Sequence, residues 1–136
     1  MALKNELRLN NLINCIYHDD DDNETSCIGR VMCIDDTGLG EWVIWVDSEA
    51  KVEEYDSFEP INLTEEWLIK FGFELNVDGY WIDRNNIVFD MGCLCIGNYF
   101  ESEKDHYQLV GAEITHVHSF QNGYMFLTGE ELKTTK

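Results

Sequence analysis

The sequence has few basic side chains. Lysine and arginine together number 9 in 136 residues, against 27 aspartates and glutamates, so the formal net charge is −18. A surface of this sign repels nucleic acid and anionic membranes, and it attracts basic protein surfaces at a raised, salt-sensitive rate. Direct binding of DNA or RNA is therefore the least favoured partner class.

Long hydrophobic runs are also missing. No stretch approaches the roughly 18–20 apolar residues that a membrane-spanning helix needs, and residues 1–11 lack the apolar segment of a secretory signal. The five cysteines are an odd number and stand in apolar, strand-like contexts, which favours a reducing compartment and free buried thiols. We therefore expect a cytoplasmic protein that does not bind membranes.

Familiar catalytic and metal-binding motifs are absent as well. The chain has no Walker loop, dinucleotide-binding fingerprint or HExxH motif, and Ser119 lies in no nucleophile elbow. Cys93 and Cys95 lack the two-residue spacer of zinc knuckles, while His116 and His118 should diverge if they lie on a helix. We expect no catalytic residue, no metal and no cofactor.

The first 60 residues read as a series of short strands. Runs rich in strand-forming residues occur at 6–17, 26–36, 41–47 and 51–61, and turn residues separate them. Short strands at this spacing are typical of small barrels. The pattern predicts an SH3-like small β-barrel or a bent antiparallel sheet.

A helix and a hairpin follow. Thr64 is the expected N-cap of a short helix with glutamates in its first turn, and Gly72 is its expected stop. The pair Asp78-Gly79 joins two alternating runs and predicts a hairpin of the type I′ kind. The side chains that this helix should bury are Trp67, Leu68 and Phe71.

Further strands and a final helix complete the pattern. Residues 86–100 and 106–111 read as strands, with Gly92 and Gly97 as bulges. Apolar side chains then recur at helical spacing up to Gly129, the expected stop. That seam consists of Ile114, Val117, Phe120, Tyr124 and Leu127. The chain is thus predicted to be one α+β domain, residues 1–136, with a strand-rich half at 1–60 and a helix-sheet-helix half at 61–136.

Two phrases carry a resemblance to a known family. "EPINLTEEWLIKFGFE" at 59–74 and "ITHVHSFQNGYMFLTGEEL" at 114–132, with the opening "NELRLNN" at 5–11, resemble small uncharacterised proteins of bacteria, prophages and phages. This chain departs from them at Gly123, where a bulky apolar residue is usual, and in its "DDDDNE" loop. The resemblance implies a mobile-element protein in a bacterial cytoplasm, and it implies no activity, cofactor or site.

The acidic tract at 19–24 has three interpretations. Alternate acids at Asp20, Asp22 and Glu24 imitate the start of a calcium loop, but the glycine and the final glutamate of an EF-hand are missing. Adjacent carboxylates can still gather a divalent ion weakly. The tract can also bind a protein, or it can be a solvated loop that keeps strand edges apart.

The sequence is best explained as a non-enzymatic protein that binds a basic surface of another protein. Carboxylates on a rigid scaffold can imitate the phosphate spacing of nucleic acid. An inhibitor of a host defence nuclease, of the anti-CRISPR type, fits this chemistry. Tryptophans beside carboxylates suit an interface centre. The candidate partner-binding residues are Asp19, Asp20, Asp21, Asp22, Glu24, Asp35, Asp36, Trp45, Glu53, Glu54, Asp56 and Trp81.

Two other function classes stay open. A virion or assembly component would form a defined oligomer, whereas the sequence fixes no oligomeric state. A small enzyme would need a pocket with convergent polar groups.

Overall fold

A computed structural model of the chain describes residues 7–36, 42–48, 55–90, 92–96, 107–108 and 113–134. The chain forms two compact units, Met1–Ile61 (unit 1) and Asn62–Lys136 (unit 2). Neither helix in the described part of the chain is long and apolar enough to cross a membrane.

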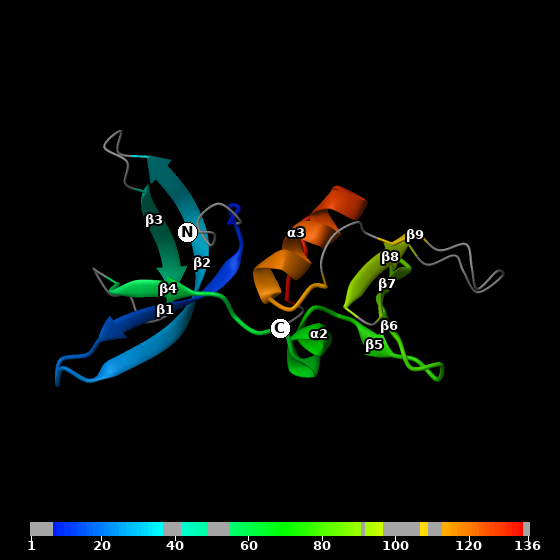
Figure 1. Cartoon of the computed structure of the whole chain (residues 1–136), viewed down its shortest axis with the longest axis horizontal. Helices are drawn as coiled ribbons and strands as arrows, with labels where there is room; N and C mark the ends of the chain where they lie inside the picture. The colour runs from blue at the N-terminus through cyan, green and yellow to red at the C-terminus, as the bar shows by residue number, and fades with distance from the viewer. Residues whose placement is uncertain are drawn as a thin grey trace. The chain divides into compact units, whose positions relative to one another are not determined.

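Unit 1 is an open, bent antiparallel sheet (Figure 1). Its strands are β1 (Leu12–His18), β2 (Glu24–Asp36), β3 (Trp42–Ser48) and β4 (Ser57–Glu59). Their order in the sheet is β3-β2-β1-β4, and within the described residues they do not close into a barrel. The α+β class and the bent-sheet alternative are therefore confirmed. The SH3-like barrel does not form because β4 pairs with β1 and leaves β3 at the opposite edge.

The core of unit 1 lies on one face of this sheet. Ile13, Cys15 and Val31 are fully buried there, because alternate residues of a strand point to the same face. Gly29 lies opposite Ile13 and leaves room for the Cys15 thiol: a Cβ added at Gly29 would lie 2.7 Å from Cys15 Sγ. Partly buried side chains complete the core: Cys27, Ile34, Ile44, Val46, Tyr55 and Phe58.

A β-bulge in β2 changes which side chains face outward. The register between β2 and β3 shifts between Val31 and Cys33, so Val31 pairs with Val46 whereas Cys33 pairs with Trp45. Strict alternation from Val31 would bury Cys33. The extra residue instead leaves both Met32 and Cys33 exposed.

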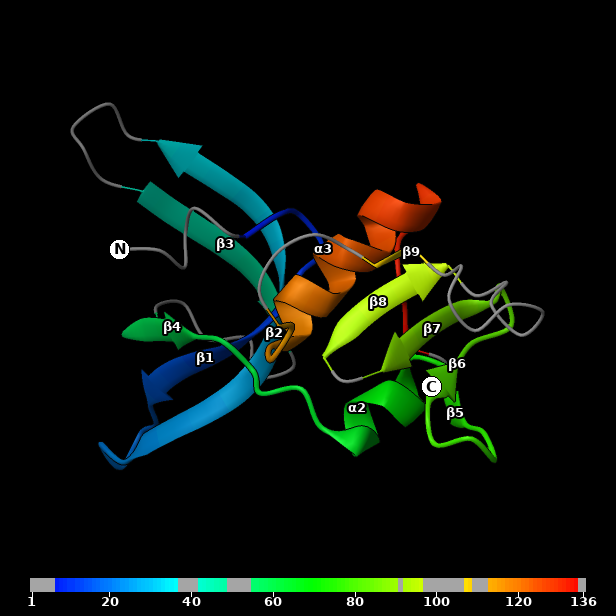
Figure 2. The same cartoon turned by 45° about the vertical axis from the view of Figure 1, so that its right-hand side comes forward.

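The described residues of unit 2 form a five-stranded antiparallel sheet and two helices. The strands, β5 (Glu74–Leu75), β6 (Trp81–Ile82), β7 (Ile87–Asp90), β8 (Cys93–Ile96) and β9 (Tyr107–Gln108), lie in chain order across the sheet. The helices are α2 (Glu65–Lys70) and α3 (Val117–Thr128), and α3 lies beside β8 (Figure 2).

Helix α2 begins and ends as its sequence predicts. The Thr64 hydroxyl accepts a hydrogen bond from the Trp67 N–H at 3.4 Å, and the acids of the first turn offset the helix dipole. The chain leaves the helix at Phe71, and Gly72 takes the left-handed conformation with φ 91°. The predicted burial of Trp67, Leu68 and Phe71 is confirmed.

The hairpin at Asp78-Gly79 is not of type I′. That turn requires positive φ at both central residues, and here Gly79 has φ 93° while Asp78 is not among the positive-φ residues. The loop is longer, because the last strand pair is Leu75 with Trp81. The Asn76 side-chain oxygen accepts hydrogen bonds from the Asp78 and Tyr80 N–H groups and so stabilises this wider turn.

The predicted bulge at Gly92 is also wrong, and Gly97 lies outside the described residues. Gly92 has φ 81° and belongs to the connection between β7 and β8, whose last pair is Asp90 with Cys93. The tight turn needs the left-handed conformation that glycine adopts easily. A Cβ there would lie 2.1 Å from the Glu113 side chain.

Helix α3 is continuous through Gly123 and ends at Gly129, which has φ 75° as the left-handed cap. Ile114 is buried but precedes the helix, which starts at Val117. Phe120 is fully buried and its ring contacts three neighbouring aromatic rings. Those rings belong to Phe71, Phe73 and Phe89.

Candidate functional site

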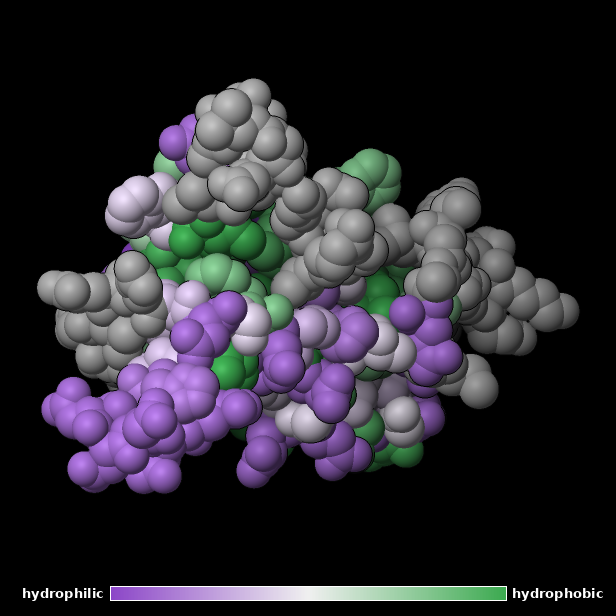
Figure 3. Space-filling view, turned by 60° about the vertical axis from the view of Figure 1, so that its left-hand side comes forward, coloured by the Kyte–Doolittle hydropathy of each residue, from purple (hydrophilic) through white to green (hydrophobic). Residues whose placement is uncertain are grey.

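Most of the predicted acidic residues meet at one end of unit 1, where the turn between β1 and β2 lies next to the start of β4. We call this group the acidic end. It consists of Asp19, Asp20, Asp21, Asp22, Glu24 and Asp56, all exposed. In Figure 3 a group of hydrophilic residues, purple, gathers at the lower left of the surface. Strand pairing brings these residues together. Because β4 pairs with β1, Asp56, which directly precedes β4, lies beside the β1–β2 hairpin.

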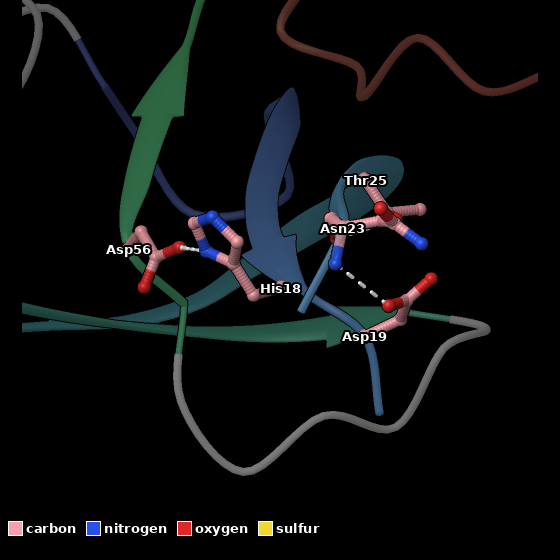
Figure 4. Close-up of polar contacts among 5 residues, drawn as sticks. All are labelled: His18, Asp19, Asn23, Thr25 and Asp56. Atoms are coloured by element: carbon pink, nitrogen blue, oxygen red, sulfur yellow. Dashed lines mark hydrogen bonds and ion pairs between the residues drawn. The ribbon is translucent and has the colours of Figure 1, made fainter. Parts of the chain in front are cut away.

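The turn itself is organised by Asp19. One carboxylate oxygen accepts hydrogen bonds from the Asp21 and Asn23 N–H groups, both at 2.9 Å. Figure 4 shows the bond from Asn23. The Asp22 backbone has φ 63°, a left-handed conformation that Asp tolerates better than most residues. Asp20 and Asp21 carry no such structural role among the described contacts, and both are exposed. Their carboxylates therefore face water at the tip of the hairpin.

Among the described residues of the acidic end, His18 is the one side chain that can carry a positive charge. Its Nδ1 lies 2.5 Å from Asp56 Oδ2, as Figure 4 shows. The hydrogen bond to Asp56 raises the pKa of His18 above its ordinary value, and the nearby charges of Asp22 and Glu24 act in the same direction. The charge of His18 thus interacts with three carboxylates, those of Asp22, Glu24 and Asp56.

Sequence reasoning did not single out His18. The sequence places it directly before Asp19, and an antiparallel hairpin closed around the acidic tract sets it opposite Glu24, as observed. The position of His18 next to the acidic tract could therefore have been read from the sequence. Its contact with Asp56 could not, because that contact depends on the pairing of β4 with β1 and joins residues 38 positions apart.

The remaining acidic candidates lie elsewhere or outside the described residues. Asp35 is exposed near the far end of β2, and Asp36 is the last residue of that strand. Asp35 lies eleven positions after Glu24, which corresponds to roughly 35 Å of extended strand. Glu53 and Glu54 fall outside the described residues. The structure therefore splits the predicted acidic set instead of forming one cluster.

The two candidate tryptophans belong to different units. Trp45 in β3 is 60% exposed on the face of the sheet opposite the core. Trp81 in β6 is half-buried and pairs with Leu75 and Phe89. Trp45 has the exposure that an interface residue needs.

Two histidines lie together at the start of α3. The rings of His116 and His118 stack, with centroids 5.7 Å apart and an angle of 16° between planes, so the predicted divergence is wrong. The reason is that His116 is the extended N-cap residue and not part of the helix. Within the described ranges, no group of three or more histidine, cysteine or acidic side chains is placed to hold a metal ion.

A hydrogen-bonded triad in unit 2 has a structural role. The Tyr124 hydroxyl donates to Asp83 Oδ2 at 2.5 Å and accepts from Asn85 Nδ2 at 2.9 Å. Burial and the bond to Asp83 raise the pKa of Tyr124 to about 12. The phenol is therefore protonated at neutral pH and ties α3 to the turn before β7.

Comparison with protein families, with curated proteins and with solved structures finds no match to this chain.

Proposed function

We propose that this protein binds a basic surface of another protein through the acidic end and catalyses no reaction. The supporting observation is the gathering of six exposed carboxylates from three segments of unit 1, with His18 as their one described counter-charge. Exposed carboxylates at a hairpin tip attract lysine and arginine over a range set by ionic strength, about 8 Å at physiological salt. Such contacts raise the association rate and make binding selective for partners with a basic surface.

The partner class that fits best is a protein whose own ligand is nucleic acid. Its binding surface is already complementary to closely spaced negative charges. The net charge of −18 keeps nucleic acid itself away from this chain. An inhibitor that occupies a nucleic-acid channel, as an anti-defence protein of a phage or mobile element would, follows from this chemistry.

The test is a comparison of three tagged proteins as baits in bacterial lysate. The first is the wild type. The second, the tip variant, carries Asp20→Asn, Asp21→Asn and Asp22→Asn. Asparagine, like aspartate, tolerates the left-handed backbone conformation at position 22. The third, the distal variant, removes the same charge from exposed acids of unit 2 through Glu74→Gln, Asp78→Asn and Asp90→Asn.

We expect the wild type and the distal variant to capture the same basic protein at low salt and release it at high salt or on addition of duplex DNA. The tip variant should capture several-fold less of it, because each removed charge weakens the attraction. Equal capture by the tip variant and the wild type would refute the proposal. Recovery of only the bait itself would favour an assembly component.

A further inference from the structure

The four-stranded sheet of unit 1 has a second face, opposite its core, and that face has an unusual composition. We call it the outer face. In an antiparallel sheet with one face packed, the other is normally polar. Here Ile28 is 42% exposed, Met32 49% and Trp45 60%. These three lie on the adjacent strands β2 and β3.

Strand register shows that these side chains continue into β1. Leu12 and Ile16 point to the same face and are half-buried, since Leu12 pairs with Arg30 and Ile16 with Ser26. Isolated exposed apolar residues are ordinary on protein surfaces. Five on one face of three neighbouring strands form a patch, and patches mark interaction sites. The bulge after Val31 contributes by leaving Met32 exposed beside Trp45.

The patch has the dimensions of one helix. Along β2 it runs from the position opposite Ile16 to the position opposite Trp45, residues 26–33, or roughly 23 Å of strand. Across the sheet it spans β3, β2 and β1, which is about 10 Å. A helix of about 15 residues is close to 22 Å long and about 10 Å wide.

Carboxylates border the patch. Glu24 lies at one end and Asp35 at the other, while Glu59 on β4 pairs with Asn14 at one edge. Arg30 lies within the patch, but its guanidinium is 3.7 Å from the Asp47 carboxylate, which offsets its charge. The border is therefore acidic, and inside it the patch is apolar apart from the Arg30–Asp47 pair and Asn14.

We propose that the outer face of the unit 1 sheet is a docking surface for an amphipathic basic helix of a partner protein. The apolar stripe of that helix lies on Trp45, Met32 and Ile28, and its lysines or arginines face the bordering carboxylates. This inference rests on the proposed function and adds the apolar centre of the interface. Interfaces derive much of their affinity from such centres, with tryptophan prominent among them.

The test uses a defined probe, a fluorescein-labelled peptide of about 15 residues built from leucine and lysine with all leucines on one helical face. Its affinity for the full chain is measured by fluorescence anisotropy at low and high salt. The patch variant carries Met32→Ser and Trp45→Ser. The matched control carries Ile69→Ser and Phe126→Ser, which are exposed apolar residues of unit 2.

We expect the patch variant to bind roughly tenfold more weakly at both salt concentrations and the control to match the wild type. A peptide of the same composition without an apolar face should lose most affinity at high salt. Equal affinity of patch variant and wild type, with circular dichroism unchanged, would overturn the inference. So would a wild-type dimer in sedimentation that the patch variant dissolves, because the occupant would then be a second copy.

The tip variant separates the two proposals. If it lowers affinity at low salt while the patch variant has no effect, the acidic end is supported and the docking surface fails. If the patch variant lowers affinity and the tip variant does not, the outer face binds and the proposed role of the acidic end fails.

Discussion

At the scale of single residues, the aspartates of the β1–β2 turn are not equivalent. Asp19 organises the turn by accepting from two backbone N–H groups, and Asp22 occupies a left-handed position. The carboxylates of Asp20 and Asp21 make no hydrogen bond among the described residues, and both side chains are exposed to water. The turn thus needs two of its aspartates for its own structure and presents the other two.

This difference predicts unequal stability effects. Asp19→Ala should lower the free energy of unfolding by about 1 kcal/mol, because it removes the acceptor of two backbone N–H groups. Asp20→Ala should change it by less than about 0.5 kcal/mol, as most exposed substitutions do. Urea denaturation measures both. Equal effects of the two substitutions would show that Asp19 does not organise the turn.

His18 should titrate above its ordinary pKa of 6.5. The pair with Asp56 therefore stabilises the fold fully below about pH 6.5 and loses this contribution as pH rises through the raised pKa. Asp56→Asn should bring the pKa of His18 back toward its ordinary value, since the main cause is removed. Imidazole NMR shifts followed against pH measure this. Asp78→Asn is the control and should leave His18 unchanged, and an unchanged pKa in Asp56→Asn would contradict the contact.

The Tyr124 hydroxyl contributes to the stability of unit 2. Tyr124→Phe should lower the free energy of unfolding by about 1–2 kcal/mol, because Asp83 and Asn85 each lose a hydrogen bond in a partly buried setting. Tyr17→Phe is a matched control, since the Tyr17 hydroxyl makes no hydrogen bond to the described residues. Chemical denaturation compares them. A cost for Tyr124→Phe no larger than for Tyr17→Phe would contradict this role.

At the scale of elements, the sheet of unit 1 depends on close packing between β1, β2 and β3. Gly29→Ala should lower the free energy of unfolding by about 1–3 kcal/mol, because the new methyl group would lie 2.7 Å from Cys15 Sγ and 3.2 Å from Val46 Cβ. Adding Cys15→Ala should recover part of this loss, because it clears the thiol. A double-mutant cycle measures the coupling, and strictly additive effects would contradict it.

The sequence predicted elements whose signals are local. Thr64 caps the start of α2 through its side chain, and Gly129 caps the end of α3 through its left-handed backbone; both predictions are confirmed. It did not predict the bulge after Val31, the stacking of His116 on His118, or the pairing of β4 with β1. These features depend on partners distant in the chain or on competition between turn geometries.

The same reasoning explains what was predicted of the candidate site. The acidic tract follows from composition, and Trp45 was a candidate because tryptophan beside carboxylates suits an interface; its exposure depends on which face of the sheet is packed. The grouping of Asp56 with His18, and the separation of Asp35 from the hairpin tip, depend on strand register. The apolar outer face required knowing both the register and the bulge.

At the scale of the whole molecule, negative charge is present throughout but concentrated toward the first half. Residues 1–60 hold 15 acidic and 4 basic side chains, a net charge of −11, and residues 61–136 hold 12 and 5, a net charge of −7. This distribution agrees with a binding surface on unit 1. Because charge of one sign destabilises a compact fold by self-repulsion, a basic partner should also stabilise the chain.

Binding through the acidic end is best tested by the affinity of the captured partner for the chain across a series of salt concentrations. The wild type, the tip variant and the distal variant are compared. We predict a shallower dependence of log affinity on log salt and a lower affinity for the tip variant alone, with the distal variant close to the wild type. Identical affinity and salt dependence for the tip variant and the wild type would contradict the claim that the acidic end binds the partner.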